Sequence, residues 1–233
     1  MSSTDFGPAF RQGFKDIAPV MVAYLPIGLL WGTLAAGKGF SALEAMLTSV
    51  FVYAGASQFV AVDMWRDPAP AVLLTVTALV VNLRHMLMSA SLSRHISAVP
   101  SGWRYALLYF MTDESWAMAE RKAAQTGGGL SLGYVLGSSL LLWPTWFLSS
   151  ALGAALGQSL GDPAAIGLDF AFSAIFLTIL MGFWKGSRTG AVIVASALAA
   201  IAAKFLLPGA WYIMAGGMAG VVVAALLYRE GEA

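Results

Sequence analysis

The chain contains eight apolar stretches, each near the length that a helix needs to cross a bilayer. A spanning helix takes roughly 20 predominantly apolar residues, and its backbone groups must be hydrogen-bonded within the helix. Short polar connections separate most of the stretches and favour antiparallel packing of neighbours. The sequence therefore predicts an all-α fold, a polytopic transmembrane helix bundle of seven or eight spans. The stretches are residues 18–36, 43–62, 69–92, 105–119, 133–156, 168–184, 190–207 and 211–228.

Composition supports the same class. Of the 233 residues, 59% are hydrophobic and 11% are charged, whereas about a quarter of the residues in a soluble domain are charged. No room remains for a soluble domain. We expect one integral membrane domain over residues 1–233, with a polar N-terminal segment at 1–17 and a short tail at 229–233.

Several function classes are excluded by what the sequence lacks. A net charge of +1 without a basic run argues against nucleic acid. There is no cysteine, and two histidines are too few for a metal site without much help from carboxylates. No zinc-protease helix, nucleophile elbow or glycine-rich phosphate loop is present. We therefore expect no enzyme activity, no metal and no cofactor, and the bilayer itself as a partner.

An arginine and a histidine interrupt the third apolar stretch. Asn82, Arg84 and His85 lie in a run that is otherwise apolar, and a guanidinium in hydrocarbon needs a partner, a watery cavity or a nearby interface. Arginine suits bidentate recognition of a carboxylate, and histidine suits proton coupling. Asn82 and His85, three residues apart, are expected to share a helix face. In the alternative interpretation the span ends near Val81, and Arg84 extends into interfacial water.

A second polar group occurs late in the second stretch, in the sequence YAGASQF. Tyr53, Gly55 and Ser57 lie beside Gln58, which supplies both a donor and an acceptor. This pattern suits a cavity wall that hydrogen-bonds a zwitterion. A hydrogen bond between helices is the alternative.

Two adjacent carboxylates, Asp113 and Glu114, mark the centre of the fourth stretch. They repel one another and lose hydration in apolar surroundings, so at least one is expected to favour its protonated form. Either is a candidate to pair with Arg84 or to carry a coupled proton, and a structural salt bridge is compatible with both roles. The segment itself can be a span, a re-entrant segment or a broken helix.

Prolines and paired glycines suggest how the helices are interrupted and packed. Pro26 and Pro144 lie inside apolar stretches, and each begins a small-residue run, PIGLLWGTLAAG and PTWFLSSALGAALG. Helix breaks in corresponding halves indicate a transporter's central site and an internal repeat. Simple kinks explain the prolines equally well. Close helix packing is predicted at Gly28/Gly32, Gly133/Gly137, Gly153/Gly157 and Gly216/Gly220.

The positive-inside rule gives an expected orientation. With eight spans, one side of the membrane collects Arg11, Lys15, Arg66, Arg121, Lys122, Lys185, Arg188 and Arg229. The other side collects Lys38, Arg94, Arg104 and Lys204. Both termini are then expected in the cytoplasm.

Three ordered motifs, YAGASQF, NLRHMLMSASL and TDESWA, resemble those of the AzlC family of bacterial inner-membrane proteins. The N-terminal sequence QGFKDIAPVMVAYLPIGLLWG is similar to that family's first signature. The resemblance covers roughly Phe10 to Tyr228 and is densest up to Trp116. It implies a multi-pass protein of the inner membrane.

The resemblance further implies a function. AzlC-type proteins are large subunits of branched-chain amino acid exporters that work with a small AzlD-type membrane subunit, and export draws on the proton gradient. A passive channel-like pore and a non-transporting membrane scaffold are the alternatives. The family's motifs fall on Tyr53, Gly55, Ala56, Ser57, Gln58, Arg84, His85, Ser91, Thr112, Asp113 and Glu114.

The chain departs from the family's pattern at two places. Members often have aspartate at the position of Asn82, and some have Gly-Pro where this chain has Ser89-Ala90. Without an aspartate at position 82, the counter-charge to Arg84 is expected to come from Asp113 or Glu114.

Overall fold

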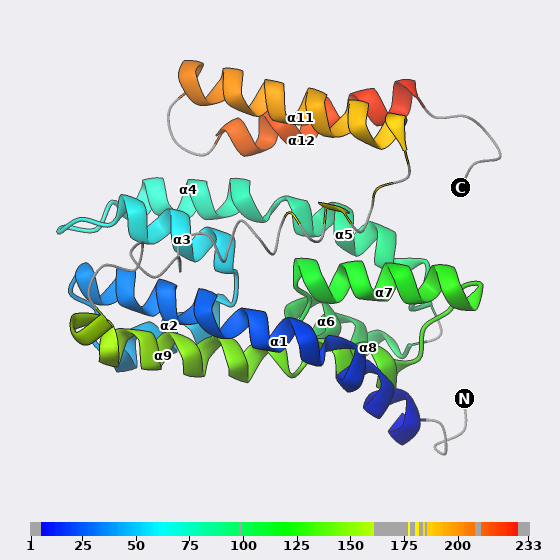
Figure 1. The fold of residues 1–233 in the computed structure, drawn as a ribbon, viewed down its shortest axis with the longest axis horizontal. Coiled ribbons are helices and arrows are strands. Elements are labelled where there is room, and N and C mark those ends of the chain that lie inside the picture. Colours follow the sequence, from blue (N-terminus) through cyan, green and yellow to red (C-terminus); the bar gives the residue numbers. More distant parts are fainter. Residues whose placement is uncertain are drawn as a thin grey trace.

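The computed structural model describes residues 6–97, 99–160, 177, 180–181, 184, 186–207 and 211–227. Regular structure in this part of the chain is entirely α-helical (Figure 1), as predicted. The helices are α1 (Phe6–Gly37), α2 (Ala42–Val52), α3 (Gly55–Met64), α4 (Ala71–Asn82), α5 (Arg84–Ser93), α6 (Ser101–Tyr109), α7 (Asp113–Thr126), α8 (Leu132–Ser139), α9 (Leu142–Leu160), α11 (Ser187–Leu206) and α12 (Trp211–Leu226).

Four segments of the described chain are long and apolar enough to cross a membrane: Phe6–Gly37, Ala71–Ser93, Leu132–Gly157 and Ser187–Leu206. They match the first, third, fifth and seventh predicted stretches. The count of seven or eight is not confirmed. The second and fourth stretches are broken helices, most of the sixth lies outside the described residues, and α12 has 16 residues.

The second predicted stretch turns back on itself instead of crossing. Its helices α2 and α3 are separated at Tyr53, whose φ of 38° lies in the left-handed region. Gln58 donates a hydrogen bond to Ser49 at 3.1 Å, although nine residues of straight helix would separate them by about 14 Å. The ring of Trp65, just after α3, packs on Phe40, just before α2, with centroids 4.7 Å apart. We call residues 42–64 the first hairpin.

The first hairpin begins at a well-defined cap. The Ser41 hydroxyl accepts a hydrogen bond from the Glu44 backbone N–H, and the Glu44 carboxylate accepts one from the Ser41 backbone N–H. These bonds satisfy donors that the helix leaves unpaired at its start. Hydrogen bonds from the Ser41 backbone N–H and hydroxyl also lower the pKa of the Glu44 carboxyl.

The fourth predicted stretch forms a second hairpin, α6 and α7, which we define as residues 101–126. Its helices are separated at residues 110–112, and Thr112 caps α7 through a reciprocal pair of bonds with Ser115. After α7 the chain returns to the start of the hairpin, where the Leu130 N–H donates to the His95 carbonyl at 2.7 Å. Of the three possibilities left open by the sequence, the structure shows a broken, re-entrant pair.

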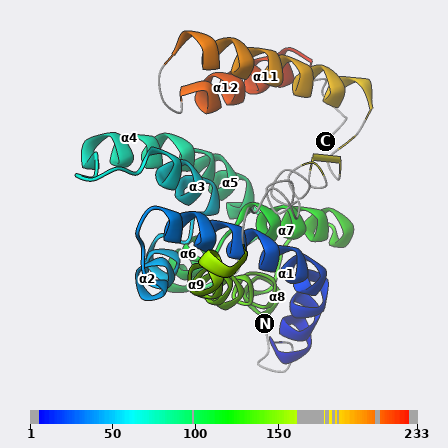
Figure 2. The ribbon, with the colours of Figure 1, turned by 60° about the vertical axis from the view of Figure 1, so that its left-hand side comes forward.

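The two hairpins enter the bundle from opposite ends. Figure 1 shows α1 running from right to left and the successive helices α4 and α5, which form one rod, running back. The first hairpin starts at the end where α1 finishes, and the second starts at the end where α5 finishes. The turned view shows the same order (Figure 2). The rod of α8 and α9 then crosses parallel to α1.

Glycines allow this parallel pair to pack backbone to backbone, as their spacing predicted. A Cβ atom at Gly32 would collide with the Ser150 carbonyl oxygen, and one at Gly153 would collide with the Leu29 carbonyl oxygen. Gly216 and Gly220 similarly pack on Ser196, which joins α12 to α11. The close approach replaces side-chain interdigitation with direct van der Waals contact between helices, the usual basis of association in lipid.

The two predicted helix breaks differ. Helix α1 continues without interruption through Pro26, so no break is seen there. The rod of α8 and α9 is interrupted at residues 140–141. Pro144 has no N–H to donate to the carbonyl four residues earlier, at Leu140, which accounts for the break.

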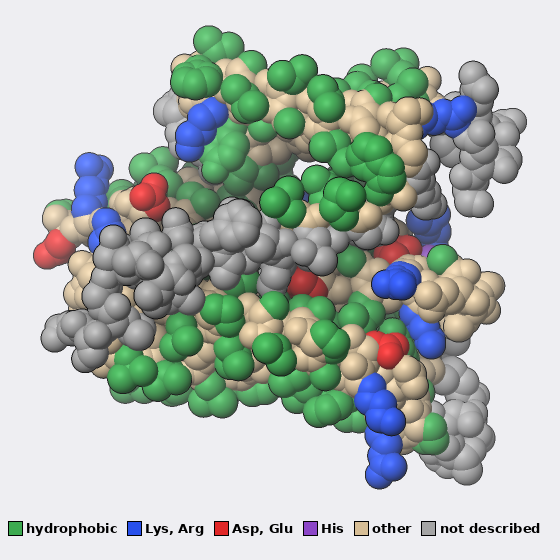
Figure 3. Space-filling view, viewed as in Figure 1, with side chains coloured by type: hydrophobic (Ala, Val, Ile, Leu, Met, Phe, Trp, Pro, Cys, Tyr) green, Lys and Arg blue, Asp and Glu red, His purple; other side chains and the backbone are tan. Residues whose placement is uncertain are grey.

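The outer surface fits a lipid environment. Large apolar side chains point outwards, with Val22 69%, Val72 80% and Phe205 85% exposed. The space-filling view shows hydrophobic side chains along the rods and Lys and Arg side chains towards their ends (Figure 3). A monomeric soluble protein rarely exposes so large an apolar surface.

Candidate functional site

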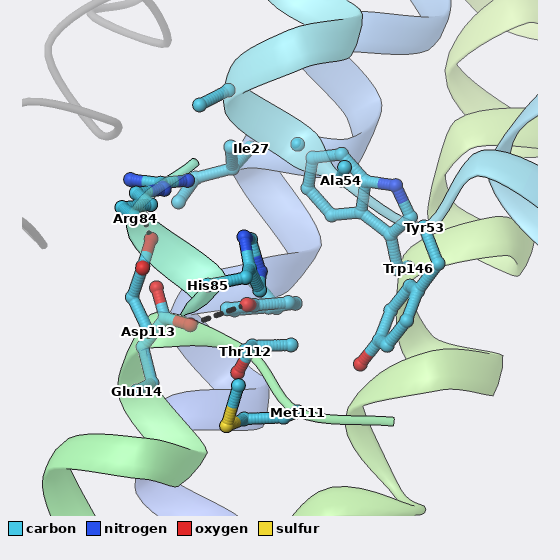
Figure 4. A pocket seen from close by; sticks show the side chains of 13 residues that line it. Ile27, Tyr53, Ala54, Arg84, His85, Met111, Thr112, Asp113, Glu114 and Trp146 are labelled. Atoms are coloured by element: carbon cyan, nitrogen blue, oxygen red, sulfur yellow. Dashed lines mark hydrogen bonds and ion pairs between the residues drawn. The ribbon is translucent and has the colours of Figure 1, made fainter. Parts of the chain in front are cut away.

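The interruptions of the helices meet in the middle of the bundle and form a pocket between them. Both hairpin tips, the start of α5, the middle of α1 and the first turns of α9 contribute to it (Figure 4). We call this the central pocket. Its lining consists of Tyr24, Ile27, Tyr53, Ala54, Gly55, Ala56, Arg84, His85, Met111, Thr112, Asp113, Glu114 and Trp146.

Arg84 forms an ion pair with Asp113 across the central pocket. Its Nη1 lies 2.9 Å from the Asp113 Oδ2, and the two side chains are 31% and 17% exposed. Arg84 is the first residue of α5, and Asp113 is the first residue of α7. The predicted counter-charge to Arg84 from the fourth stretch is therefore present. The alternative of Arg84 in interfacial water beyond the end of its span does not describe this geometry.

Glu114 occupies a different environment, although it is adjacent to Asp113. It is 8% exposed, and its Oε2 accepts a hydrogen bond of 2.6 Å from the Tyr24 hydroxyl. The ion pairs seen among the described residues are Arg84–Asp113 and His95–Glu120, so none of them involves Glu114. A buried carboxylate without a counter-charge is costly.

Gln58 does not line the central pocket; it holds one of the pocket's walls in place. Its Oε1 accepts a hydrogen bond of 2.8 Å from the Trp146 indole N–H, and its Nε2 donates to Ser49. Ser49 in turn donates to Ser150 at 2.8 Å. The alternative interpretation, a hydrogen bond between helices, is the one that describes Gln58.

The remaining predicted residues of the YAGASQF motif separate into two groups. Tyr53 and Gly55 line the central pocket, and a Cβ atom at Gly55 would lie 3.2 Å from the Trp146 ring. Ser57 is buried at 3% exposure and is not part of the lining. Helical geometry explains the division, because only residues near the break face the pocket.

The NLRH motif is also divided. His85 lines the central pocket and is half-buried, whereas Asn82, the last residue of α4, does not belong to the lining. The helix is interrupted between them at Leu83. Asn82 and His85 were expected to share a helix face because they are three residues apart, but the interruption means that only His85 lines the pocket.

Among the pocket residues that carry a polar group, Tyr24 and Trp146 were not predicted. Both carry a polar group that needs a partner when buried, and each finds one here, in Glu114 and Gln58. The available signal was an aromatic residue within two residues of Pro26 or Pro144. With 8 tryptophans and 7 tyrosines in the chain, that signal alone does not single them out.

A second polar cluster lies outside the central pocket, between α5 and α7. Glu120 accepts a hydrogen bond from the Ser91 hydroxyl, and its Oε2 lies 3.3 Å from the His95 Nε2. Ser91 and Glu120 each follow a member of the Arg84–Asp113 pair by seven residues. Helices α5 and α7 therefore run parallel, with two polar pairs joining them.

Comparison with known proteins gives a consistent result. A family model described as AzlC protein matches residues 19–160. The inner membrane protein YgaZ of Escherichia coli is 31% identical over 221 residues, which cover 92% of this chain and 89% of that protein. The branched-chain amino acid transport protein AzlC of Bacillus subtilis is 27% identical over 186 residues, 77% of this chain and 70% of that protein.

A third relative, from Archaeoglobus fulgidus, is named only as a membrane protein and is 29% identical over 85% of this chain and 87% of its own length. No solved structure matches the chain. The relatives and the four candidate spans agree on a multi-pass protein of the inner membrane. The motifs on the two hairpins and α5, together with the matched family model, show that the chain belongs to the AzlC family.

Proposed function

We propose that the chain exports branched-chain or related small amino acids across the inner membrane, coupled to protons and together with a small AzlD-like membrane subunit. The observation that carries the proposal is the central pocket, where charged groups lie between hairpins that enter from opposite ends of the bundle. Irregular backbone at the middle of a membrane bundle is tolerated where it lines a binding cavity. One relative is named a branched-chain amino acid transport protein.

The lining of the central pocket suits a small zwitterion with an aliphatic side chain. The Arg84 guanidinium can exchange Asp113 for the carboxylate of a substrate, since the planar fork binds either in the same way. A carboxyl group on the first turn of α7 is available for the ammonium group. Ile27, Met111 and Trp146 supply apolar surface for the side chain.

The placement of the hairpins supports alternating access. Because each hairpin reaches the central pocket from its own end, displacement of one hairpin opens the pocket to one side of the membrane only. A rigid core of α1 and α9, packed through glycines, is available for the hairpins to move against. Rocking of one element around a fixed midplane site is the general pattern of secondary transporters.

The first test is efflux of valine and leucine from cells that express the chain with and without its AzlD-like subunit. Arg84→Ala should abolish export without preventing insertion, because Arg84 is the one Lys or Arg among the described residues of the pocket lining, and the substrate carboxylate loses it. Arg94→Ala is the matched control, since Arg94 follows the same helix and lies outside the pocket lining. Normal efflux from the Arg84 variant would refute a central role for this residue.

The two alternative functions give different results in the same cells. A passive channel-like pore would conduct amino acids equally well after a protonophore collapses the proton gradient. A non-transporting scaffold would show no flux with any subunit. Coupled export requires flux that the protonophore suppresses.

A further inference from the structure

The charges of the central pocket are distributed unevenly between its two carboxyl groups. Asp113 is neutralised by Arg84 at 2.9 Å. Glu114, one residue later, accepts a hydrogen bond of 2.6 Å from the Tyr24 hydroxyl, which carries no charge. Among the described residues, no ion pair involves Glu114. Within the described part of the chain, the pocket therefore contains one carboxyl group paired with a cation and one without such a pair.

A buried carboxyl group in this situation has two favourable states. It can bind a proton and become neutral, or it can remain ionised and bind a cation. A hydroxyl donor stabilises the ionised oxygen, yet it supplies no net positive charge. If the substrate is an amino acid, its ammonium group is a cation of the right size for the second state. Proton and ammonium cannot occupy the same carboxyl group together.

We propose that Glu114 is the coupling site of this transporter, where a proton and the substrate's ammonium group exclude one another, and that Tyr24 positions its carboxyl group. This inference rests on the proposed function. Asp113 then has a different role, as the counter-ion that Arg84 exchanges for the substrate carboxylate. The structure thus separates two adjacent residues that the sequence could not tell apart.

The exchange requires no covalent chemistry. When the ammonium group arrives, the Glu114 carboxyl releases one proton to water and binds the cation; when a proton returns from the other side, the cation leaves. One proton then moves inwards for each amino acid that moves outwards. Among the described residues, the other ionisable or charged groups facing this site are Tyr24 from α1, Tyr53 from the tip of the first hairpin, Asp113 from α7, and Arg84 and His85 from α5.

The experiment measures proton release by the purified full-length protein in weakly buffered detergent solution when L-leucine is added. Binding of radiolabelled L-leucine is measured in parallel at acidic, neutral and alkaline pH. The wild-type protein should release protons on adding leucine and should bind leucine more weakly at acidic pH, because protons compete for Glu114.

Glu114→Gln should release no protons and should bind leucine at least about tenfold more weakly, with no dependence on pH. Loss of a charge-assisted hydrogen bond generally corresponds to a ratio of that size or larger. Glu120→Gln is the matched control, because this carboxylate lies on the same helix, outside the pocket. It should behave like the wild type. Glu114→Asp keeps a carboxyl group and should retain proton release, which excludes simple misfolding as the cause.

Tyr24→Phe tests the positioning role. It removes the donor and keeps the ring, so proton release should persist while the pH at which protons and leucine compete equally moves upwards. A purely structural role for Tyr24 would leave that midpoint unchanged.

Failure of the proposed export function and failure of the Glu114 assignment give different results. If the wild-type protein, with its AzlD-like subunit, neither binds nor transports leucine or valine, the proposed function fails and the inference with it. If leucine is transported but Glu114→Gln retains proton release and pH-dependent binding, the inference alone is wrong.

Discussion

At the scale of single residues, the polar motifs divide into groups that contact the central pocket and groups that hold its walls. Gln58 belongs to the second kind, since it links Trp146 to Ser49 and through it to Ser150. Gln58→Ala leaves the buried indole N–H of Trp146 without its partner. We expect a lower thermal unfolding midpoint in detergent, from a loss of about 1–3 kcal/mol.

Gln12→Ala provides the comparison for that measurement. Gln12 also forms a side-chain hydrogen bond, to Asp16, but on an exposed part of α1. Water replaces the lost partner there, so the unfolding midpoint should barely change. An equal decrease of the unfolding midpoint in the two variants would show that the buried hydrogen bonds of Gln58 stabilise the fold no more than the exposed one of Gln12.

At the scale of helices, the parallel pair of α1 and α9 depends on the absence of side chains at its contact. Gly153→Ala adds a Cβ atom that collides with the Leu29 carbonyl oxygen, whereas Gly217→Ala adds one in open space. Alanine favours helix equally at both positions, so the difference isolates packing. We expect Gly153→Ala to lower the free energy of unfolding by about 1–3 kcal/mol relative to Gly217→Ala. Steric trapping or thermal unfolding of purified protein measures it.

The re-entrant form of the first hairpin can be tested because the chain contains no cysteine. Phe40→Cys and Trp65→Cys, introduced together, should form a disulfide on oxidation, since the two rings pack against each other. If the disulfide forms, a maleimide polymer no longer labels the two cysteines, and reduction of the bond restores the labelling. A continuous span over residues 43–62 would hold these positions on opposite sides of the membrane, and the labelling would then persist. Phe40→Cys with His95→Cys is the negative control.

At the scale of the whole molecule, the hairpins change which charges lie together. Among the described residues of the first 160, the N-terminal end of α1 shares its side with the connection from α5 to α6 and with the end of α7. That side therefore carries Arg11, Lys15, Arg94, Arg104, Arg121 and Lys122, whereas the opposite side carries Lys38 and Arg66. The positive-inside rule favours a cytoplasmic N-terminal end.

This arrangement predicts accessibility that differs from simple alternation of eight spans. Arg104→Cys should react with a membrane-impermeant maleimide only after the cytoplasmic side is exposed, and Arg66→Cys should react in intact cells. If the eight stretches were simple alternating spans, Arg104→Cys would instead be labelled in intact cells and Arg66→Cys only from the cytoplasmic side. Labelling of Arg104→Cys from outside would contradict the two-hairpin topology.

Several features were predictable from single residues and their spacing. The cost of a guanidinium in an apolar stretch indicated a partner for Arg84, and the missing aspartate at Asn82 pointed to the fourth stretch. The glycine pairs predicted close packing, which the structure confirms at Gly28/Gly32 and Gly133/Gly137. The role of Gln58 could not be predicted, because its side-chain amide can hydrogen-bond a substrate or a neighbouring helix equally well.

The sequence by itself determined the membrane class, the all-α fold and the charged groups of the site. These follow from the length of apolar runs and from the cost of burying charge, which are local properties. Only the tertiary structure decided which segments cross and which turn back, because hydropathy measures length and polarity without direction. It also separated Asp113 from Glu114. Successive residues of a helix point about 100° apart, and their partners, Arg84 and Tyr24, come from helices far away in the sequence.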